Sequence, residues 1–586
     1  MKTLTKTDRS ASALVIAMLV VFLMAAFVGV AMYLTTGTLR QADSSRDHSG
    51  LRSATEGALD FAYGVWAKTV NSYYAPATQA QINTALATVP AFNGYGYAPA
   101  AENGPLKLSP VNGYGAPIAT PTYTLINLPG YAGWTGKNFG YLASVRLTGT
   151  TNGGRTIKYG AKRTINYSVV PLFQATAFFE DNLELYKTAT MTIGGLVHTN
   201  STAYVSSSSA SNPSLTFTGN LSYVGGYTDD AAPPLAYLWS GYSANSAFPP
   251  SYPNGADTAV HQVNRMEPLG TDPASVLDTT DANPNNDSMR ELIEPPTNTG
   301  TYPDPTPISQ RRLYNKAGII IKASGGSYTV TTQNGTNLSG IQITALKGAL
   351  SQQTVYDRRE GKWVDVTTVD VSAAKTPINN GQPGPLEDSS FNNILYVYDD
   401  NSTYADPKAV RLTNGEVLPS GGLTVASLNP VYIQGDYNIG TQSNYSDRVP
   451  SAVFGDAVTV LSNNWNDSNS ASSLSSRQAS NTTVNTAIVA GFLPSGWVNE
   501  LGAQYGYSGG LNNFPRFLET WSSDTFTYNG SMIELFTSKI ATGEWDTGNI
   551  YSPPNRNWNF DSQFIDNPPP GSLDAVTISR GSLARF

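Results

Sequence analysis

The chain has 586 residues, a net charge of −8 at pH 7 and no cysteine. Its length provides for two or more domains, its mild acidity argues against nucleic acid as a partner, and the absence of cysteine excludes disulfides and thiolate metal sites. With 13% charged residues but 53 Gly and 33 Tyr, the composition is typical of polar strands and turns rather than of a helical enzyme or a disordered tail.

The first element is an apolar run without charges over residues 11–34. About 24 residues at ~1.5 Å each span ~36 Å, which is enough to cross the hydrocarbon core of a bilayer. Lys2, Lys6 and Arg9 precede the run, so the positive-inside bias predicts a cytoplasmic leader over residues 1–10 and a periplasmic or extracellular ectodomain. A cleaved secretory signal is the alternative, but the run is about twice as long as a usual signal core. We therefore expect a retained, lipid-embedded, single-pass helix in the inner membrane.

The helical pattern continues beyond the apolar run to about residue 70. One stripe of apolar residues has three- and four-residue spacing, and it consists of Leu51, Ala54, Ala58, Phe61 and Val65. Arg52 and Glu56 lie on another face at the i,i+4 spacing that favours an ion pair. The pattern predicts one long helix, with a bend at Gly29 or Gly37, whose second half needs a partner for its apolar stripe.

Residues 71–172 are predicted to form an α+β domain. A short helix over 78–87 is followed by a loop rich in Gly, Pro and Tyr and then by three strands, at 123–128, 139–147 and 157–169. In the last two strands apolar residues alternate with polar ones, which predicts a hairpin with one apolar side. The economical arrangement packs that side against the stripe of the long helix.

This helix-and-sheet arrangement resembles a type IV pilin. The segments Ser12-Ala13-Leu14-Val15 and Ala54-Thr55-Glu56-Gly57-Ala58-Leu59 resemble the N-terminal region of PilX-type minor pilins. The resemblance implies processing near Ser10 or Ala11, contacts with other pilin-like subunits through the first helix, and a place in a pilus-like filament. The residues that it implies for membrane and assembly contacts are Ser12, Leu14, Val15, Ile16, Phe22, Phe27, Leu34, Leu51, Glu56, Ala58 and Phe61.

One feature of the pilin pattern is absent from this chain. Major pilins carry a Glu at the fifth mature position, where it neutralises the N-terminal amine of a neighbouring subunit inside the apolar filament core. Processing near Ser10 or Ala11 would place Val15 or Ile16 there, and the usual Gly before the cleavage site is also missing. A subunit at the tip has no subunit above it whose amine needs neutralising, so the absence favours a tip or initiating role. A plain single-pass anchor with an α+β stalk is the alternative.

The remaining sequence is expected to be a large β-rich ectodomain. Residues 173–500 contain short β-type runs separated by Gly and Asn, which predict a parallel β-helix, with a β-sandwich as the alternative. Residues 228–312 are rich in Pro, Asn and Asp and are interpreted as a long insertion. A hairpin over 355–371 is interpreted as an excursion from the coil, and residues 501–586 as a C-terminal cap.

No catalytic residue or cofactor is predicted. A surface β-helix raises the question of polysaccharide lyase or hydrolase activity, which needs clustered carboxylates. The nearest candidates are the turn residues 357–360 and the pair Asp399 and Asp400, but charged hairpin turns are common. His48, His198 and His261 have no spacing typical of a zinc site.

One segment alternates oxygen-bearing side chains as calcium loops do, and it consists of Asp281, Asn283, Asn285 and Asp287. Asn286 replaces the Gly of such loops, and Leu292 stands at the position of their bidentate Glu. A polar loop is therefore the preferred interpretation, and no metal is expected.

The sequence thus leads to two hypotheses. The leading one is a non-enzymatic, membrane-anchored, pilin-like surface protein that acts in filament assembly or tip adhesion. The alternative is a membrane-anchored β-helix that binds or degrades a surface polysaccharide.

Overall fold

The computed structural model describes residues 6–73, 75–87, 96–97, 106–151, 154–188, 190–229, 248–253, 255–270, 276–378, 381–441, 446–498, 502 and 504–586, without the side chains of residues 6–12, 73, 96–97 and 257. Contacts divide the chain into two compact units. We call the first the helical unit (Met1–Tyr123, Phe139–Tyr167 and Ile578–Phe586) and the second the β-rich unit (Thr124–Asn138 and Ser168–Thr577). A long N-terminal helix followed by a mainly β chain confirms the expected fold class.

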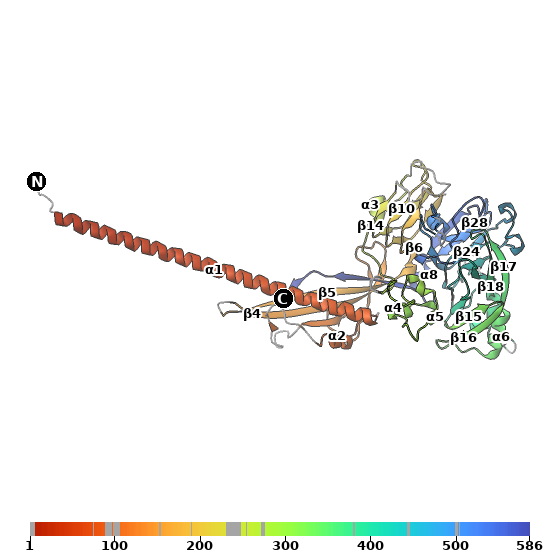
Figure 1. Cartoon of the computed structure of the whole chain (residues 1–586), viewed down its shortest axis with the longest axis horizontal. Coiled ribbons are helices and arrows are strands. Elements are labelled where there is room, and N and C mark those ends of the chain that lie inside the picture. The colour runs from red at the N-terminus through yellow and green to blue at the C-terminus, as the bar shows by residue number, and fades with distance from the viewer. Residues whose placement is uncertain are drawn as a thin grey trace. The chain divides into compact units, whose positions relative to one another are not determined.

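The helical unit is built on one uninterrupted helix, α1 (Lys6–Tyr73), which Figure 1 shows as a single ribbon. It passes through Gly29 and Gly37 without a break in its helical assignment. The short helix α2 (Gln79–Ala85) begins with a capping box, in which the Thr78 side chain accepts from the Gln81 backbone while the Gln81 side chain accepts from the Thr78 backbone.

The sheet of the helical unit is centred on two long neighbouring strands, β4 (Thr135–Thr150) and β5 (Thr156–Pro171). Strands β1 (Gly96–Tyr97) and β2 (Lys107–Val111) pair antiparallel with β4, and β32 (Ala584–Arg585) pairs antiparallel with β5. Strand β31 (Asp574–Arg580) also neighbours β5. The chain therefore returns to this sheet at its C-terminal end, which the sequence patterns did not reveal.

One face of α1 is buried, as expected, but the buried residues are only partly those of the predicted stripe. Of the predicted stripe, Leu51, Ala54 and Ala58 are buried, whereas Phe61 and Val65 are half-buried. Buried apolar positions further along the helix are Leu59, Ala62, Trp66 and Val70. The Trp66 ring lies 5.4 Å from that of Tyr141 on β4 and 6.1 Å from that of Tyr167 on β5, so this half of the helix packs on the sheet.

The β-rich unit contains a large sheet of 11 strands in which nearly all pairs are parallel. Its order is β14-β12-β9-β6-β29-β26-β23-β21-β19-β15-β16. The strands are β6 (Ala175–Phe179), β9 (Leu196–Thr199), β12 (Leu221–Tyr223), β14 (Val260–Gln262), β15 (Ile319–Ser324), β16 (Ser327–Thr332), β19 (Ile394–Tyr398), β21 (Leu423–Ala426), β23 (Ser451–Gly455), β26 (Ala487–Phe492) and β29 (Met532–Thr537). Among the described strand pairs of this sheet, only β15–β16 is antiparallel.

Most strands that lie between those of the large sheet in the sequence belong to smaller sheets. One contains β17 (Leu350–Asp357), β18 (Lys362–Asp370), β20 (Lys408–Thr413), β22 (Val431–Gln434), β24 (Val458–Leu461) and β27 (Pro515–Phe517). Another contains β25 (Thr482–Asn485), β28 (Thr525–Gly530) and β30 (Asn555–Phe560). Near the N-terminal end of the unit, β7 (Leu183–Leu185), β10 (Ala203–Val205) and β13 (Tyr227–Thr228) form a third, and β8 (Met191–Ile193) and β11 (Leu215–Phe217) a fourth. From β19 to β30, consecutive strands lie in different sheets, and the strand pairs of this part are parallel. This is the pattern that the β-helix hypothesis predicts.

Two expectations for this unit need correction. The hairpin β17–β18 exists, but it is no excursion, because β18 pairs in parallel with β20 and so belongs to the smaller sheet. Residues 501–586 do not form a separate cap, because β27, β28, β29 and β30 pair within the parallel sheets and β29 lies in the middle of the largest one. Both corrections depend on pairing between strands that are distant in the sequence, and local sequence patterns do not reveal such pairing.

The order of the large sheet shows how the chain is routed. The chain first adds strands from β6 to one end of the sheet at β14. It then starts again near the other end at β15 and adds strands back toward the middle, until β29 pairs with β6. Residues 263–318, which we call the return segment, connect β14 to β15 across nine strand spacings, or about 43 Å at ~4.8 Å each. The return segment includes α4 (Thr306–Ser309) and α5 (Leu313–Lys316).

The return segment corrects the interpretation of residues 228–312 as a simple insertion. Its residues Met289, Leu292 and Ile293 are buried with Tyr396 and Phe454 in one hydrophobic cluster, which covers one face of the large sheet. The opposite face forms a second cluster inside the coils. Because both faces are buried, the strands read as continuous apolar runs rather than alternating ones. Residues 230–247, 254 and 271–275 lie outside the described part of the chain.

Candidate functional site

The N-terminal half of α1 exposes an unbroken apolar surface. Residues 11–39 contain no charge, and the side chains of Phe22 and Phe27 are 81% and 72% exposed. The other predicted contact residues of this half are exposed as well, namely Leu14, Val15, Ile16 and Leu34. By length and composition α1 is able to cross a membrane. Exposed apolar surfaces of this extent are typical of membrane-binding or protein-binding sites.

Polar groups near the end of this surface are satisfied within the helix. The hydroxyls of Thr35, Thr36 and Thr38 donate to backbone carbonyls three or four residues earlier, among them that of Ala31. Such internal bonds allow a threonine to remain in an apolar medium without an unpaired donor. These three threonine hydroxyls therefore do not interrupt the apolar surface before Leu39.

The predicted processing residues Ser10 and Ala11, together with Ser12, lie within α1, but their side chains are outside the described part. The fifth positions that these sites imply, Val15 and Ile16, are apolar and exposed. The first Glu of the chain is Glu56, which lies far from them in the sequence.

The C-terminal half of α1 carries the remaining predicted assembly residues. Leu51 and Ala58 are fully buried within the helical unit, and Phe61 is half-buried. Glu56 is half-buried and accepts a 2.9 Å hydrogen bond from Nε of Arg52, as the i,i+4 spacing predicted. Leu51 and Ala58 therefore hold α1 on its own sheet and are not available to a neighbouring subunit, which sequence periodicity could not distinguish.

The charged turn at residues 357–360 is a buried structural network. Asp357 accepts from the backbone N–H groups of Arg359 and Glu360 and from the Tyr432 hydroxyl, at 2.8, 3.1 and 2.6 Å. Glu360 pairs with Arg516 at 3.0 Å, and burial raises the pKa of Glu360 to about 7. The other candidate carboxylates hold local contacts, since Asp399 caps the backbone of Asn401 and Asp400 pairs with Lys322.

The candidate calcium loop closes on itself through hydrogen bonds. Asp281 accepts from the Asn283 backbone at 2.8 Å, and Asn283 accepts from the Asn285 backbone at 3.1 Å. The Asn285 side chain accepts from the N–H of Thr297 at 2.7 Å and donates to its carbonyl at 2.9 Å. Asp287 is exposed. These contacts are those of a polar loop, and calcium binding there stays an untested hypothesis.

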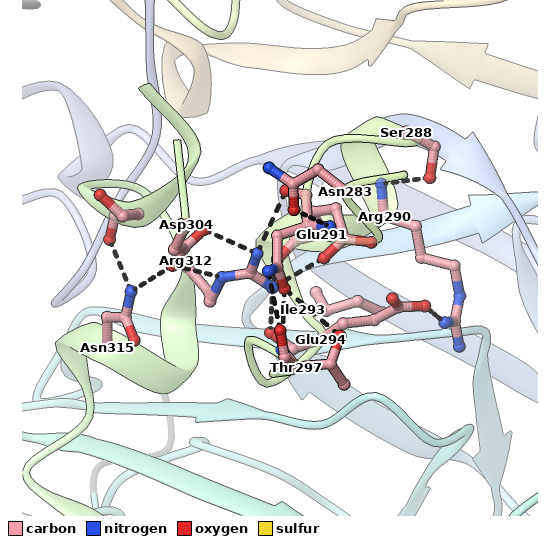
Figure 2. Close-up of polar contacts among 12 residues, drawn as sticks. Asn283, Ser288, Arg290, Glu291, Ile293, Glu294, Thr297, Asp304, Arg312 and Asn315 are labelled. Atoms are coloured by element: carbon pink, nitrogen blue, oxygen red, sulfur yellow. Dashed lines mark hydrogen bonds and ion pairs between the residues drawn. The ribbon is translucent and has the colours of Figure 1, made fainter. Parts of the chain in front are cut away.

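A buried arginine of the return segment anchors this loop. Arg312 is fully buried and forms a bidentate contact with Asp304 at 2.9 and 3.0 Å. Its Nη1 donates to the Glu291 carboxylate at 2.9 Å and to the backbone carbonyls of Glu291 and Glu294 at 2.7 and 2.6 Å. Figure 2 shows Arg312 between these partners. Nearby, Arg290 pairs with Asp456 at 3.0 Å. Sequence patterns gave no signal for this network, because its partners lie on different turns of an irregular segment.

The histidines do not form a site. His198 is fully buried between Ser222 and Asn200, at 2.8 and 3.0 Å, and burial lowers its pKa to about 4. Among the described residues, no group of three or more His, Asp or Glu side chains is arranged to hold a metal.

The comparisons with known proteins found resemblances among solved structures alone. No protein-family model matches the chain, and no curated protein matches it. Among solved structures, the competence-associated pilin ComZ from Thermus thermophilus aligns with a TM-score of 0.28 and 12% identity, covering 92% of this chain and 97% of that one. A TM-score of this size does not establish a common fold, so the fold assignment rests on the helices and sheets described above.

Proposed function

We propose that this chain is a membrane-anchored, pilin-like surface protein without enzymatic activity, and that it acts in filament assembly or adhesion. The supporting observation is the division of α1 into an exposed apolar half and a half buried on an antiparallel sheet. A helix that served only as a membrane anchor could end near Leu34, whereas α1 continues to Tyr73 as the core of the helical unit.

We further propose a position at the tip of the filament or at its initiation. The reason is electrostatic: an N-terminal amine in an apolar filament core needs a nearby carboxylate, and α1 carries none between Ala11 and Leu39. A subunit without a neighbour above it does not need that carboxylate. This position also suits adhesion, because the β-rich unit would then be free to meet other surfaces.

The first experiment is mass spectrometry of the mature N-terminus, after expression in a bacterium with a prepilin peptidase. Cleavage near Ser10 or Ala11 with N-methylation of the new terminus is expected. Retention of Met1 in such a cell would overturn pilin processing. A chain lacking residues 2–9 serves as the control, because it removes the basic leader and, of α1, only the residues that precede Ser10.

A second experiment distinguishes filament assembly from plain anchoring. A photo-crosslinking amino acid at Phe22, which is 81% exposed on the apolar surface, is expected to capture another pilin-like subunit. The same group at Tyr114, which is 98% exposed outside α1, is the matched control. Capture of lipid alone at Phe22 would support the plain anchor instead.

A further inference from the structure

A cleft of about 500 Å³ opens in the β-rich unit at the junction of β29 and β6. Its walls come from three distant parts of the chain: Glu180 and Asp181 after β6, residues 287–289 of the return segment, and residues 535–539 of β29 and its continuation. Trp497 lines it as well. The junction is the point where the two parts of the large sheet meet, and ligand sites are usually clefts of about this volume.

Part of the lining of the cleft is aromatic and apolar. The half-buried Trp497 packs against Tyr505 with 5.7 Å between ring centroids, and Met289 and Phe536 are buried beside the cleft. An indole held in place by a neighbouring ring offers a flat apolar surface with low conformational freedom. The C–H face of a sugar ring is complementary to such a surface.

The lining of the cleft also carries the carboxylates of Glu180, Asp181 and Asp287. Glu180 is paired with Arg265, whereas Asp181 and Asp287 are exposed. The ammonium of Lys539 lies 3.5 Å from Glu294 and is therefore shared with another carboxylate. The surplus of carboxylates repels anionic ligands and favours neutral or amine-bearing ones.

Two buried polar atoms beside the cleft have no partner among the described residues. Thr542 lines the cleft and is only 2% exposed, yet its hydroxyl makes no hydrogen bond. On β29, Oε2 of Glu534 accepts from the backbone N–H groups of Glu180 and Asp181, both at 3.0 Å, while its buried Oε1 has no partner. Buried polar groups are normally paired, and the hydroxyls of a sugar could supply the missing partner of Thr542.

We propose that this cleft binds a neutral or amine-bearing oligosaccharide, with Trp497 as the stacking surface and Asp181, Asp287 and Thr542 as polar contacts. The inference deepens the proposed adhesive role by naming the ligand class. It concerns binding only, and no bond is made or broken.

The test is calorimetric titration of the full chain in detergent with chitotetraose, with its fully deacetylated form and with tetragalacturonate. Binding of the first two, but not of the anionic third, is expected. Trp497→Ala is expected to weaken binding at least tenfold, about 1.4 kcal/mol, whereas Trp497→Phe keeps a ring and most of the affinity. Trp363→Ala, at a tryptophan that is 57% exposed on β18, is the matched control and should bind as the wild type does.

Three outcomes would overturn the inference: no binding of either sugar by the wild type, preference for tetragalacturonate, or equal losses for Trp497→Ala and Trp363→Ala. Circular dichroism of each variant separates loss of folding from loss of binding. The result is independent of the proposed filament role, because N-terminal processing and crosslinking at Phe22 are measured without any sugar.

Discussion

At the scale of single residues, the β-rich unit is notable for carboxyl groups buried without a basic partner. Glu184 is 1% exposed, and its carboxyl group accepts hydrogen bonds from the hydroxyls of Ser495 and Ser508 at 2.6 and 3.2 Å. Burial raises its pKa from 4.5 to about 7. Burial likewise raises the pKa of Glu519 to about 7.

These shifts predict that stability falls as the pH rises. Between pH 4.5 and 7 the folded Glu184 keeps a proton that the unfolded chain has released, so its contribution is complete below pH 4.5 and is lost on approach to pH 7. His198 acts in the opposite direction, because burial lowers its pKa to about 4 and the folded state therefore gains stability as the pH rises to about 6.5. Glu184 and Glu519 together outweigh this single group, so the melting temperature of the full chain is expected to be higher at pH 5 than at pH 7.5. Glu184→Gln should reduce this dependence, by an amount of order 3 kcal/mol across the interval.

The control for this prediction is Glu416→Gln, because Glu416 is exposed. It should leave the pH dependence of the melting temperature unchanged. Glu184→Gln is expected to remove only part of the dependence, since Glu519 titrates in the same direction. A wild-type melting temperature that rises from pH 5 to pH 7.5 would contradict the prediction.

At the scale of elements, α1 shows why a regular stripe predicts a packed helix only approximately. The buried positions Ala54, Ala58, Ala62, Trp66 and Val70 are spaced by four residues. Each step of four advances the direction of the side chain by ~40° beyond a full turn, so the buried face winds around the helix. A β-sheet is twisted, and the helix packs along that twisted surface instead of along one line.

Trp66 tests how strongly the helical unit depends on this contact. The side chain is fully buried against Tyr141 and Tyr167. Trp66→Ala is expected to destabilise the helical unit by about 3–5 kcal/mol, because it removes apolar burial and leaves a cavity. Hydrogen exchange of the amides of β4 and β5, followed by mass spectrometry, measures this loss within the unit. Tyr114→Ala, at a 98% exposed side chain, should leave the exchange unchanged. Equal protection in both variants would show that the helix and the sheet are stable without each other.

At the scale of the whole molecule, the β-rich unit depends on contacts between distant segments. Strand β29 pairs with β6, which lies more than 350 residues earlier, and the return segment covers the sheet between its two ends. A parallel sheet needs both of its apolar faces covered. The return segment must therefore stay packed on the sheet. The buried ion pairs of Arg312 with Glu291 and Asp304 stabilise it there (Figure 2).

Arg312→Met is accordingly expected to destabilise the β-rich unit by about 3–5 kcal/mol. The substitution leaves Glu291 and Asp304 as buried carboxylates without their cation, which costs more than the lost contacts alone. Denaturant unfolding followed by tryptophan fluorescence measures the effect. Lys347→Met, which removes a charge from the exposed side of α6 (Gly340–Gly348), should change the free energy of unfolding by less than ~0.5 kcal/mol. Similar midpoints for the two variants would show that the network contributes nothing.

The amino-acid sequence by itself determined the long helix, its apolar exposed half, the hairpin of the helical unit and the mainly β character of the rest. Each of these depends on interactions between residues close in the chain, so spacing and composition record it. The β17–β18 hairpin was predictable for the same reason, but its membership of a parallel sheet was not.

Only the tertiary structure decided which strands pair, how the chain returns across the large sheet, and where a cleft opens. Glu180, Trp497 and Lys539 line one cavity although they are separated by more than 300 residues at the widest, and Arg312 meets acidic partners on separate turns. Such groupings depend on the register and order of distant strands. Apolar periodicity shows that a strand is buried, but it does not specify the strand beside it.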